Sequence, residues 1–272
     1  MLNKFRHKWE LPMVFLAILL AVVATIVAIA LLANQLKVPD WLMTIVLAAY
    51  VSPFAIALFL HYNYWKEVVN SVEVNEGQYP ELYEIFREQA EKCELGFIPK
   101  LYVKNGNGTM NAFAAKAGVS KTSGYIVVYS DIVDTFYELG DAETIRFILS
   151  HELGHIKLGH VTVRRNLLKG VLKPLFLSDT LVRAQEYSAD RFGAAINQQG
   201  IATKSLSVLI AGKRNYQSFD VAKYIEKDAK EISWFWVAIV NFMANHAVGR
   251  RRLAAAHDMD TKGWENVHGK ML

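Results

Sequence analysis

Long uncharged runs of apolar residues fill most of the first sixty positions of this chain. The run 11–33 exceeds the roughly twenty residues that a helix needs to cross the hydrocarbon layer of a membrane. A second run, 41–60, follows after a short polar stretch that contains Pro39. We therefore predict a transmembrane helical hairpin. A cleaved signal peptide would have a shorter apolar region and no second span directly after it.

Basic residues flank the two predicted spans unequally. Those outside the hairpin loop are Lys4, Arg6, Lys8 and Lys66, whereas the loop carries only Lys37. By the positive-inside rule, both ends of the hairpin then lie in the cytoplasm. We expect an integral protein of the inner or plasma membrane, in contact with the lipid bilayer, with the remainder of the chain facing the cytoplasm.

A third apolar stretch, 232–248, is predicted not to cross the membrane. It contains Asn241, Asn245 and His246, which are costly in a lipid-exposed span. A crossing would also place the three arginines of 250–252 on the outer side, against the positive-inside rule. We expect a buried or membrane-grazing helix there.

Beyond residue 70 the chain mixes polar and apolar positions and carries regular turn residues, as packed domains do. We predict a membrane anchor at 1–69 and a folded domain at 70–272. Helical patterns cover about 80–96, 141–160, 181–197 and 202–210, and strand patterns cover 101–103, 110–115 and 125–129. The predicted fold class is α+β, mainly helical with a small β-sheet.

Composition excludes some classes of function. The net charge is +4, and no block of like charges could follow a phosphate backbone, which argues against nucleic acid as a partner. The single cysteine, Cys93, rules out an intramolecular disulfide framework and fits a reducing compartment.

Residues 151–155 read HELGH, an H-E-x-x-H pattern. His151 and His155 lie one helical turn apart and point the same way, which suits two ligands of a tetrahedral zinc ion. Glu152 is offset by one residue, so its carboxylate can act as general base on a metal-bound water without ligating the metal. A catalytic zinc also needs a third protein ligand, from a different element.

The stretch 186–190, EYSAD, offers that ligand. Glu186 and Asp190 lie four residues apart on one helical face. We predict that Glu186 completes a site for one Zn²⁺ per chain, and that Asp190 accepts a hydrogen bond from a ligating histidine. Taken alone, such an acidic pair is more often a solvated helix surface.

His160 is close to the place of a third histidine ligand in the metzincin pattern, but it is one residue short. Leu158 stands where that pattern has glycine. A continuous helix would also turn the ring of His160 away from His151 and His155. We therefore predict that His160 is not a ligand.

With HELGH and EYSAD together, the sequence resembles the membrane gluzincin zinc metallopeptidase family that includes the HtpX heat-shock proteases and the CAAX prenyl proteases. Residues 79–82 resemble that family's opening helix, 111–114 match its N-A-F-A strand, and the likeness extends over about 70–255. The resemblance implies a zincin-like domain whose strand pairs with an extended substrate backbone, although a plain core strand is the alternative. The residues of this substrate strand are Asn111, Ala112, Phe113 and Ala114.

Two departures from the family pattern bear on the site. The family commonly has a histidine followed by proline, with an arginine six positions after the histidine; His246 and Arg252 keep the spacing, but Ala247 replaces the proline. The resemblance makes both residues candidates for stabilising the transition state or ordering the site. HtpX-type members also carry two further spans between the metal motifs, where 156–185 has a basic amphipathic segment, either membrane-surface or simply packed.

The expected function is that of a membrane-anchored zinc endopeptidase acting on protein or peptide substrates, possible membrane proteins among them, in membrane-protein quality control. The alternative is a membrane-tethered chaperone or adaptor with a latent or structural metal site, which a fourth protein ligand would reveal. A prenyl-protein processing enzyme is a third interpretation, disfavoured because two spans are too few to build a large intramembrane chamber.

Overall fold

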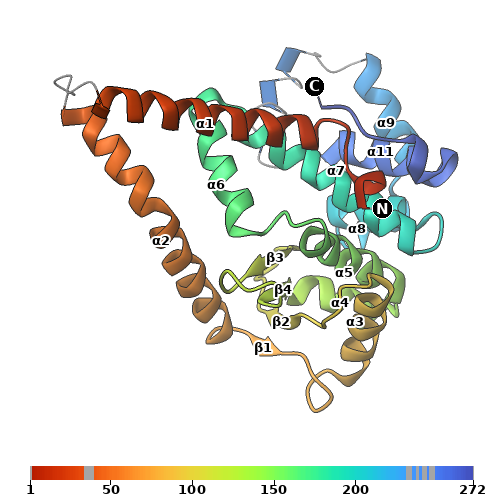
Figure 1. Cartoon of the computed structure of the whole chain (residues 1–272). Coiled ribbons are helices and arrows are strands. Elements are labelled where there is room, and N and C mark those ends of the chain that lie inside the picture. The colour runs from red at the N-terminus through yellow and green to blue at the C-terminus, as the bar shows by residue number, and fades with distance from the viewer. Residues whose placement is uncertain are drawn as a thin grey trace.

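The computed structural model describes residues 2–33, 40–230, 235–236, 239–240, 244 and 249–271. Helices dominate it, and a four-stranded sheet lies among them (Figure 1). This confirms the predicted mainly helical α+β class with a small sheet. Most of the predicted helix at 232–248, with the candidate residue His246, lies outside the described residues.

The helices are α1 (Glu10–Ala33), α2 (Asp40–Val68), α3 (Pro80–Lys92), α4 (Ser130–Leu139), α5 (Ala142–Lys157), α6 (Val163–Leu172), α7 (Ser178–Ile196), α8 (Ile201–Ala211), α9 (Val221–Lys230) and α11 (Gly249–Lys262). The strands are β1 (Val72–Glu73), β2 (Lys100–Lys104), β3 (Ala112–Lys116) and β4 (Gly124–Tyr129). Short 3-10 helices occupy Leu2–Phe5, Lys173–Leu175, Asn215–Ser218 and Trp264–Asn266.

The sheet has the order β1-β2-β4-β3, with β2 parallel and β3 antiparallel to β4. Successive side chains of β4 point to opposite faces, as the pleat requires. Ile126 and Val128 enter the main core with α3 and α5, whereas Tyr125 and Val127 face the end of α2 around Tyr64. Within the described sheet, β3 forms one edge.

The first predicted span is present as an apolar helix. Glu10–Leu31 is long and apolar enough to cross a membrane, with a mean hydropathy of 3.1, and only 11% of that window is buried. α2 is helical throughout the second predicted span, 41–60, which stays a prediction as a membrane crossing. The two helices diverge from the connection between them, and α6 lies in the opening (Figure 1).

The apolar face of α6 packs against protein. Leu168 and Leu172 are buried with Val14 and Ala17 of α1 and with Leu181 of α7. Of the two interpretations of this basic amphipathic segment, the packed helix therefore accounts for its apolar side. The contact also fixes the first turns of α1 to the rest of the fold, while the exposed part of α1 continues beyond it.

The chain ends are fastened to α7 by the buried Arg191. Its Nη2 donates to the carbonyl of Lys4 at 2.7 Å, its Nε donates to that of Phe5 at 3.2 Å, and its Nη1 donates to that of Val267. Arg191 is 2% exposed, so these carbonyls have replaced water as its partners. Residues before α1 are thus part of the packed structure.

We expect Arg191→Met to lower the free energy of unfolding by about 2–4 kcal/mol, because three buried carbonyls lose a charged donor. The loosened N-terminal segment should then be cut rapidly by trypsin after Lys4 or Lys8. Thermal unfolding in detergent and timed proteolysis measure both effects. Arg87→Met is the control, since Arg87 pairs with Glu84 at the surface. Equal trypsin resistance in both variants would contradict the fastening role of Arg191.

Candidate metal centre

The HELGH segment lies in α5, between two well-defined helix ends. Asp141 caps the start, with its Oδ1 accepting the backbone N–H of Thr144 at 3.1 Å. The helix ends at Lys157, earlier than the predicted 160, because Gly159 adopts a left-handed conformation with φ 75°. The chain therefore turns directly after the second histidine of the motif.

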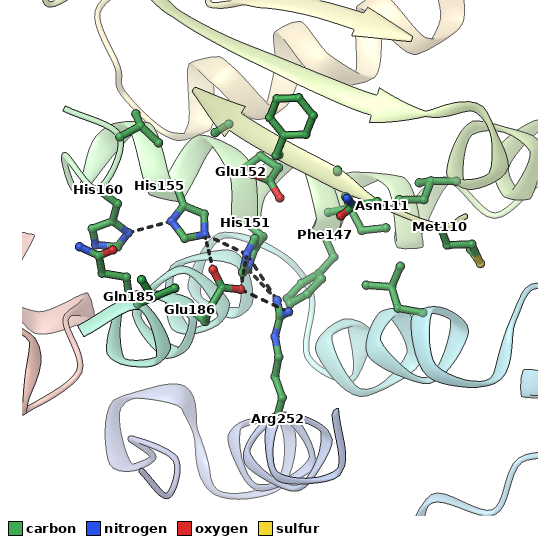
Figure 2. Close-up of a pocket in the computed structure, with 18 of the residues that line it drawn as sticks. Met110, Asn111, Phe147, His151, Glu152, His155, His160, Gln185, Glu186 and Arg252 are labelled. Atoms are coloured by element: carbon green, nitrogen blue, oxygen red, sulfur yellow. Dashed lines mark hydrogen bonds and ion pairs between the residues drawn. The ribbon is translucent and has the colours of Figure 1, made fainter. Parts of the chain in front are cut away.

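Three side chains from two helices converge beside a cavity (Figure 2). His151 and His155 come from α5, and Glu186 comes from α7. Nε2 of His155 lies 3.1 Å from Nε2 of His151 and 3.3 Å from Oε1 of Glu186, and Nε2 of His151 lies 3.6 Å from Oε2 of Glu186. Within the described part of the chain, these three form the one group of histidine, cysteine and acidic side chains with metal-binding spacing.

This donor set fits zinc in chemistry and spacing. Two imidazoles and one carboxylate are a known catalytic zinc set, and tetrahedral ligands about 2.0–2.1 Å from the metal lie about 3.3–3.4 Å apart. The separations of 3.1–3.6 Å bracket that value. Both ring Nε2 atoms also lie within 3.6 Å of the Glu186 carboxylate, so one ion could contact all three side chains.

The remaining ring nitrogens of the two histidines each have a partner. Nδ1 of His151 lies 2.9 Å from Oδ1 of Asp190, at the distance of the hydrogen bond predicted for Asp190. Nδ1 of His155 lies 2.9 Å from Nδ1 of His160. The expectation that the His160 ring turns away from His155 was wrong, because it assumed a continuous helix and the turn at Gly159 reverses the chain.

Arg252 approaches from α11 on the opposite side (Figure 2). Its Nε and Nη2 form a fork on Asp190, at 2.6 and 2.7 Å, and its Nη1 lies 3.4 Å from Oε2 of Glu186. Its Nη2 is also 3.2 Å from Nδ1 of His151. A bidentate pair of this kind fixes Asp190 in place.

Asp190 and Glu186 decide the protonation of His151 without a metal. Burial and the charge of Arg252 both lower the pKa of the ring, but the two carboxylates outweigh them and raise it to about 9. The two carboxylates therefore favour a positive charge at the ring. A bound divalent metal would take the place of that proton.

A cavity of about 430 Å³ opens onto these residues. Glu152 lines this cavity next to His151 (Figure 2), and it is not a member of the metal-binding group. The edge strand and the residue before it also line the cavity, and they contain the predicted substrate-strand residues: Asn111, Ala112, Phe113 and Ala114. Lys169 and Gln185, which the sequence pattern did not single out, line the same space.

The two motif helices come this close because glycines face the crossing. A Cβ at Gly154 would lie 3.0 Å from Cδ1 of Phe192, and one at Gly193 would lie 3.1 Å from Cε2 of Phe147. Both distances are shorter than ordinary carbon contacts. A larger side chain at either position would push α5 and α7 apart, and with them the histidines and Glu186.

Comparisons with known proteins bear on the same segment. The model of Peptidase family M48 matches residues 76–180, which contain HELGH and end before Glu186. Proteins named "Protease HtpX homolog" match too: that of Helicobacter acinonychis is 27% identical over 111 residues, that of Helicobacter pylori 25% over 142, and that of Thermodesulfovibrio yellowstonii 38% over 85.

These matches cover 41%, 49% and 31% of this chain, and 33%, 43% and 27% of the respective relatives. The chain thus matches less than half the length of each. No solved structure shows a significant match. The class that the family model, the names of the relatives and the His151, His155 and Glu186 group support is that of the metallopeptidases. The resemblance to the membrane zinc metallopeptidase family, with its HtpX-type proteases, is thereby confirmed.

We expect Gly154→Val to separate α5 from α7 and to reduce the zinc bound per chain. The steric cost should be about 1–3 kcal/mol, as for other overpacked core positions. Metal analysis after gel filtration and thermal unfolding give the two readouts. Gly170→Val is the matched control, because a Cβ there meets no atom within 4 Å. Full zinc content in the Gly154 variant would rule out the crossing as the feature that aligns the ligands.

Proposed function

We propose that this chain is a membrane-anchored zinc endopeptidase. The observation that carries the proposal is the convergence of His151, His155 and Glu186 beside Glu152, at the wall of a cavity lined by an edge strand. Residues 1–69 carry the two-span anchor, with the segment before α1 packed onto α7, and 70–272 form the zincin-like domain, which faces the cytoplasm. The protease names of the relatives support the class of activity.

His151, His155 and Glu186 hold the metal, and Asp190 keeps the ring of His151 oriented through its Nδ1. Bound zinc supplies a Lewis acid that polarises the scissile carbonyl and lowers the pKa of water. Arg252 acts by ordering the site, since its guanidinium is committed to Asp190. By resemblance, we assign to His246 a role in stabilising the transition state or in ordering the site.

Glu152 is the general base. The residue is 6% exposed and lines the cavity beside His151, where its carboxylate takes a proton from the attacking water and passes it to the leaving amine. It lies one position from a ligand on the same helix, which places it near the metal without occupying a ligand position. Burial shields this proton transfer from bulk solvent.

The substrate is a protein or peptide bound in extended form against β3. β4 pairs with one side of this strand, and in the described sheet no strand covers the other side. Its free backbone groups can therefore hydrogen-bond a substrate strand next to the metal ligands. The apolar α1 points to substrates in or at the membrane, and membrane-protein quality control is the role that we propose.

The competing interpretation is a chaperone or adaptor with a structural metal site. Structural zinc sites are closed by four protein ligands, whereas catalytic sites keep one position open. Within the described residues, the metal-binding group has three members and adjoins a cavity. This arrangement favours the enzyme.

We expect Glu152→Gln to keep one zinc per chain and to cut casein hydrolysis by about 10²–10⁴-fold, since only the proton transfer is lost. Glu186→Ala should lose both metal and activity. The assay is chelator-sensitive cleavage by the purified full chain in detergent, with metal analysis. Glu143→Gln, on the same helix but paired with Lys204 at the surface, is the control. Undiminished cleavage by Glu152→Gln would refute the assignment.

A further inference from the structure

His160 occupies a fixed, buried place behind the metal ligand His155. Its backbone N–H donates to the carbonyl of His155 at 2.9 Å, and its ring is 1% exposed. The two Nδ1 atoms lie 2.9 Å apart (Figure 2). His160 therefore contacts the side of His155 that points away from the metal position.

On its far side, His160 meets Glu10, the first residue of α1. Nε2 of His160 lies 3.3 Å from Oε1 of Glu10, which is fully buried. The same carboxylate accepts hydrogen bonds from Nη2 of Arg165 at 3.0 Å and from the hydroxyl of Ser188 at 2.7 Å. It also forms an ion pair with Arg6. Residues from α6, from α7 and from the segment before α1 thus hold the carboxylate in one position.

The proton positions of this chain of groups follow from the metal geometry. His155 directs Nε2 toward the metal position, so its ring proton must sit on Nδ1. That proton needs an acceptor, and Nδ1 of His160 is the atom within reach. His160 must then carry its own proton on Nε2, which lies 3.3 Å from Oε1 of Glu10. The alignment is not that of a regular hydrogen bond, so the contact between this ring and the carboxylate is electrostatic.

We propose that Glu10, acting through His160, is a positioning residue for the metal ligand His155, so that the seating of the N-terminal helix sets the metal affinity of the site. The inference rests on the proposed function, in which His155 binds the metal. The first turn of the apolar helix α1 would then orient a metal ligand as well as begin the membrane anchor.

The packing of α1 supports a tight connection between helix and site. Glu10 is followed on the same helix by Val14 one turn later and by Ala17 two turns later, and both are buried against α6 and α7. Movement of α1 away from α6 would therefore withdraw the carboxylate from His160. The metal ligand would lose its oriented partner, and metal affinity would fall without any change in the ligands themselves.

The test is zinc affinity of the full chain in detergent, measured by competition with a chromophoric chelator, together with the absorption spectrum of the cobalt form. Removing a group that hydrogen-bonds a metal-bound histidine lowers the metal affinity about 10–100-fold. We expect His160→Phe to lower the zinc affinity by that factor. Glu10→Gln should lower the zinc affinity too. His160→Asn should recover part of it, because its amide can again accept from His155.

Glu67→Gln is the control, since Glu67 is also a buried carboxylate but pairs with Lys104 at the end of α2. It should leave the zinc affinity and the cobalt spectrum unchanged. Wild-type affinity and spectrum in both folded His160→Phe and Glu10→Gln would overturn the inference. If Glu10→Gln does not fold, Glu10→Asp answers the same question with the charge kept and the reach shortened.

Failure of the proposed function gives a different result. In that case the wild-type chain itself binds no stoichiometric zinc or cleaves no protein, before any variant is compared. A wild type that binds zinc and cleaves casein, with variants of unaltered affinity, would instead refute the positioning role alone.

Discussion

The close crossing of α5 and α7 is the constraint on which the rest of the site depends. Donor atoms from the two helices lie 3.3 and 3.6 Å apart, and that spacing leaves no room for a side chain at Gly154 or Gly193. The aromatic rings of Phe147 and Phe192 fill the space that the glycines leave, so the approach is close without being empty. Gly154, which lies inside HELGH, thus allows the close packing that brings the two histidines of the same motif to Glu186.

Buried charge then has to be balanced, and both ends of the chain contribute to that balance. Asp190 is fully buried and is matched by Arg252 from the C-terminal helix, while Glu10 from the N-terminal helix is matched by Arg6 and Arg165. Removing one partner of such a pair leaves an uncompensated charge, which costs far more than the pair contributes. The N-terminal and C-terminal segments are therefore fixed around the same two helices.

Much of the fold and of the first coordination sphere could be predicted from the sequence, because the relevant signals are local. Asp141 is a residue type that caps helices, and it marks the start of α5. The positions of β2 and β4 follow from runs of β-branched and aromatic residues. The end of α5 could not be placed in this way. A glycine inside HELGHIKLGH is compatible with a helix, and only the left-handed backbone at Gly159 shows that the chain turns there.

The sequence by itself determined which residues share a helical face, since the helical period fixes that His151 and His155 point together and that Glu186 and Asp190 do the same. Only the tertiary structure decided which faces meet. Glu10 lies 150 positions from His160, and Arg252 lies 62 from Asp190. No periodicity connects positions so far apart, because contacts of that kind arise from the packing of whole helices and leave no trace in the local order of residues.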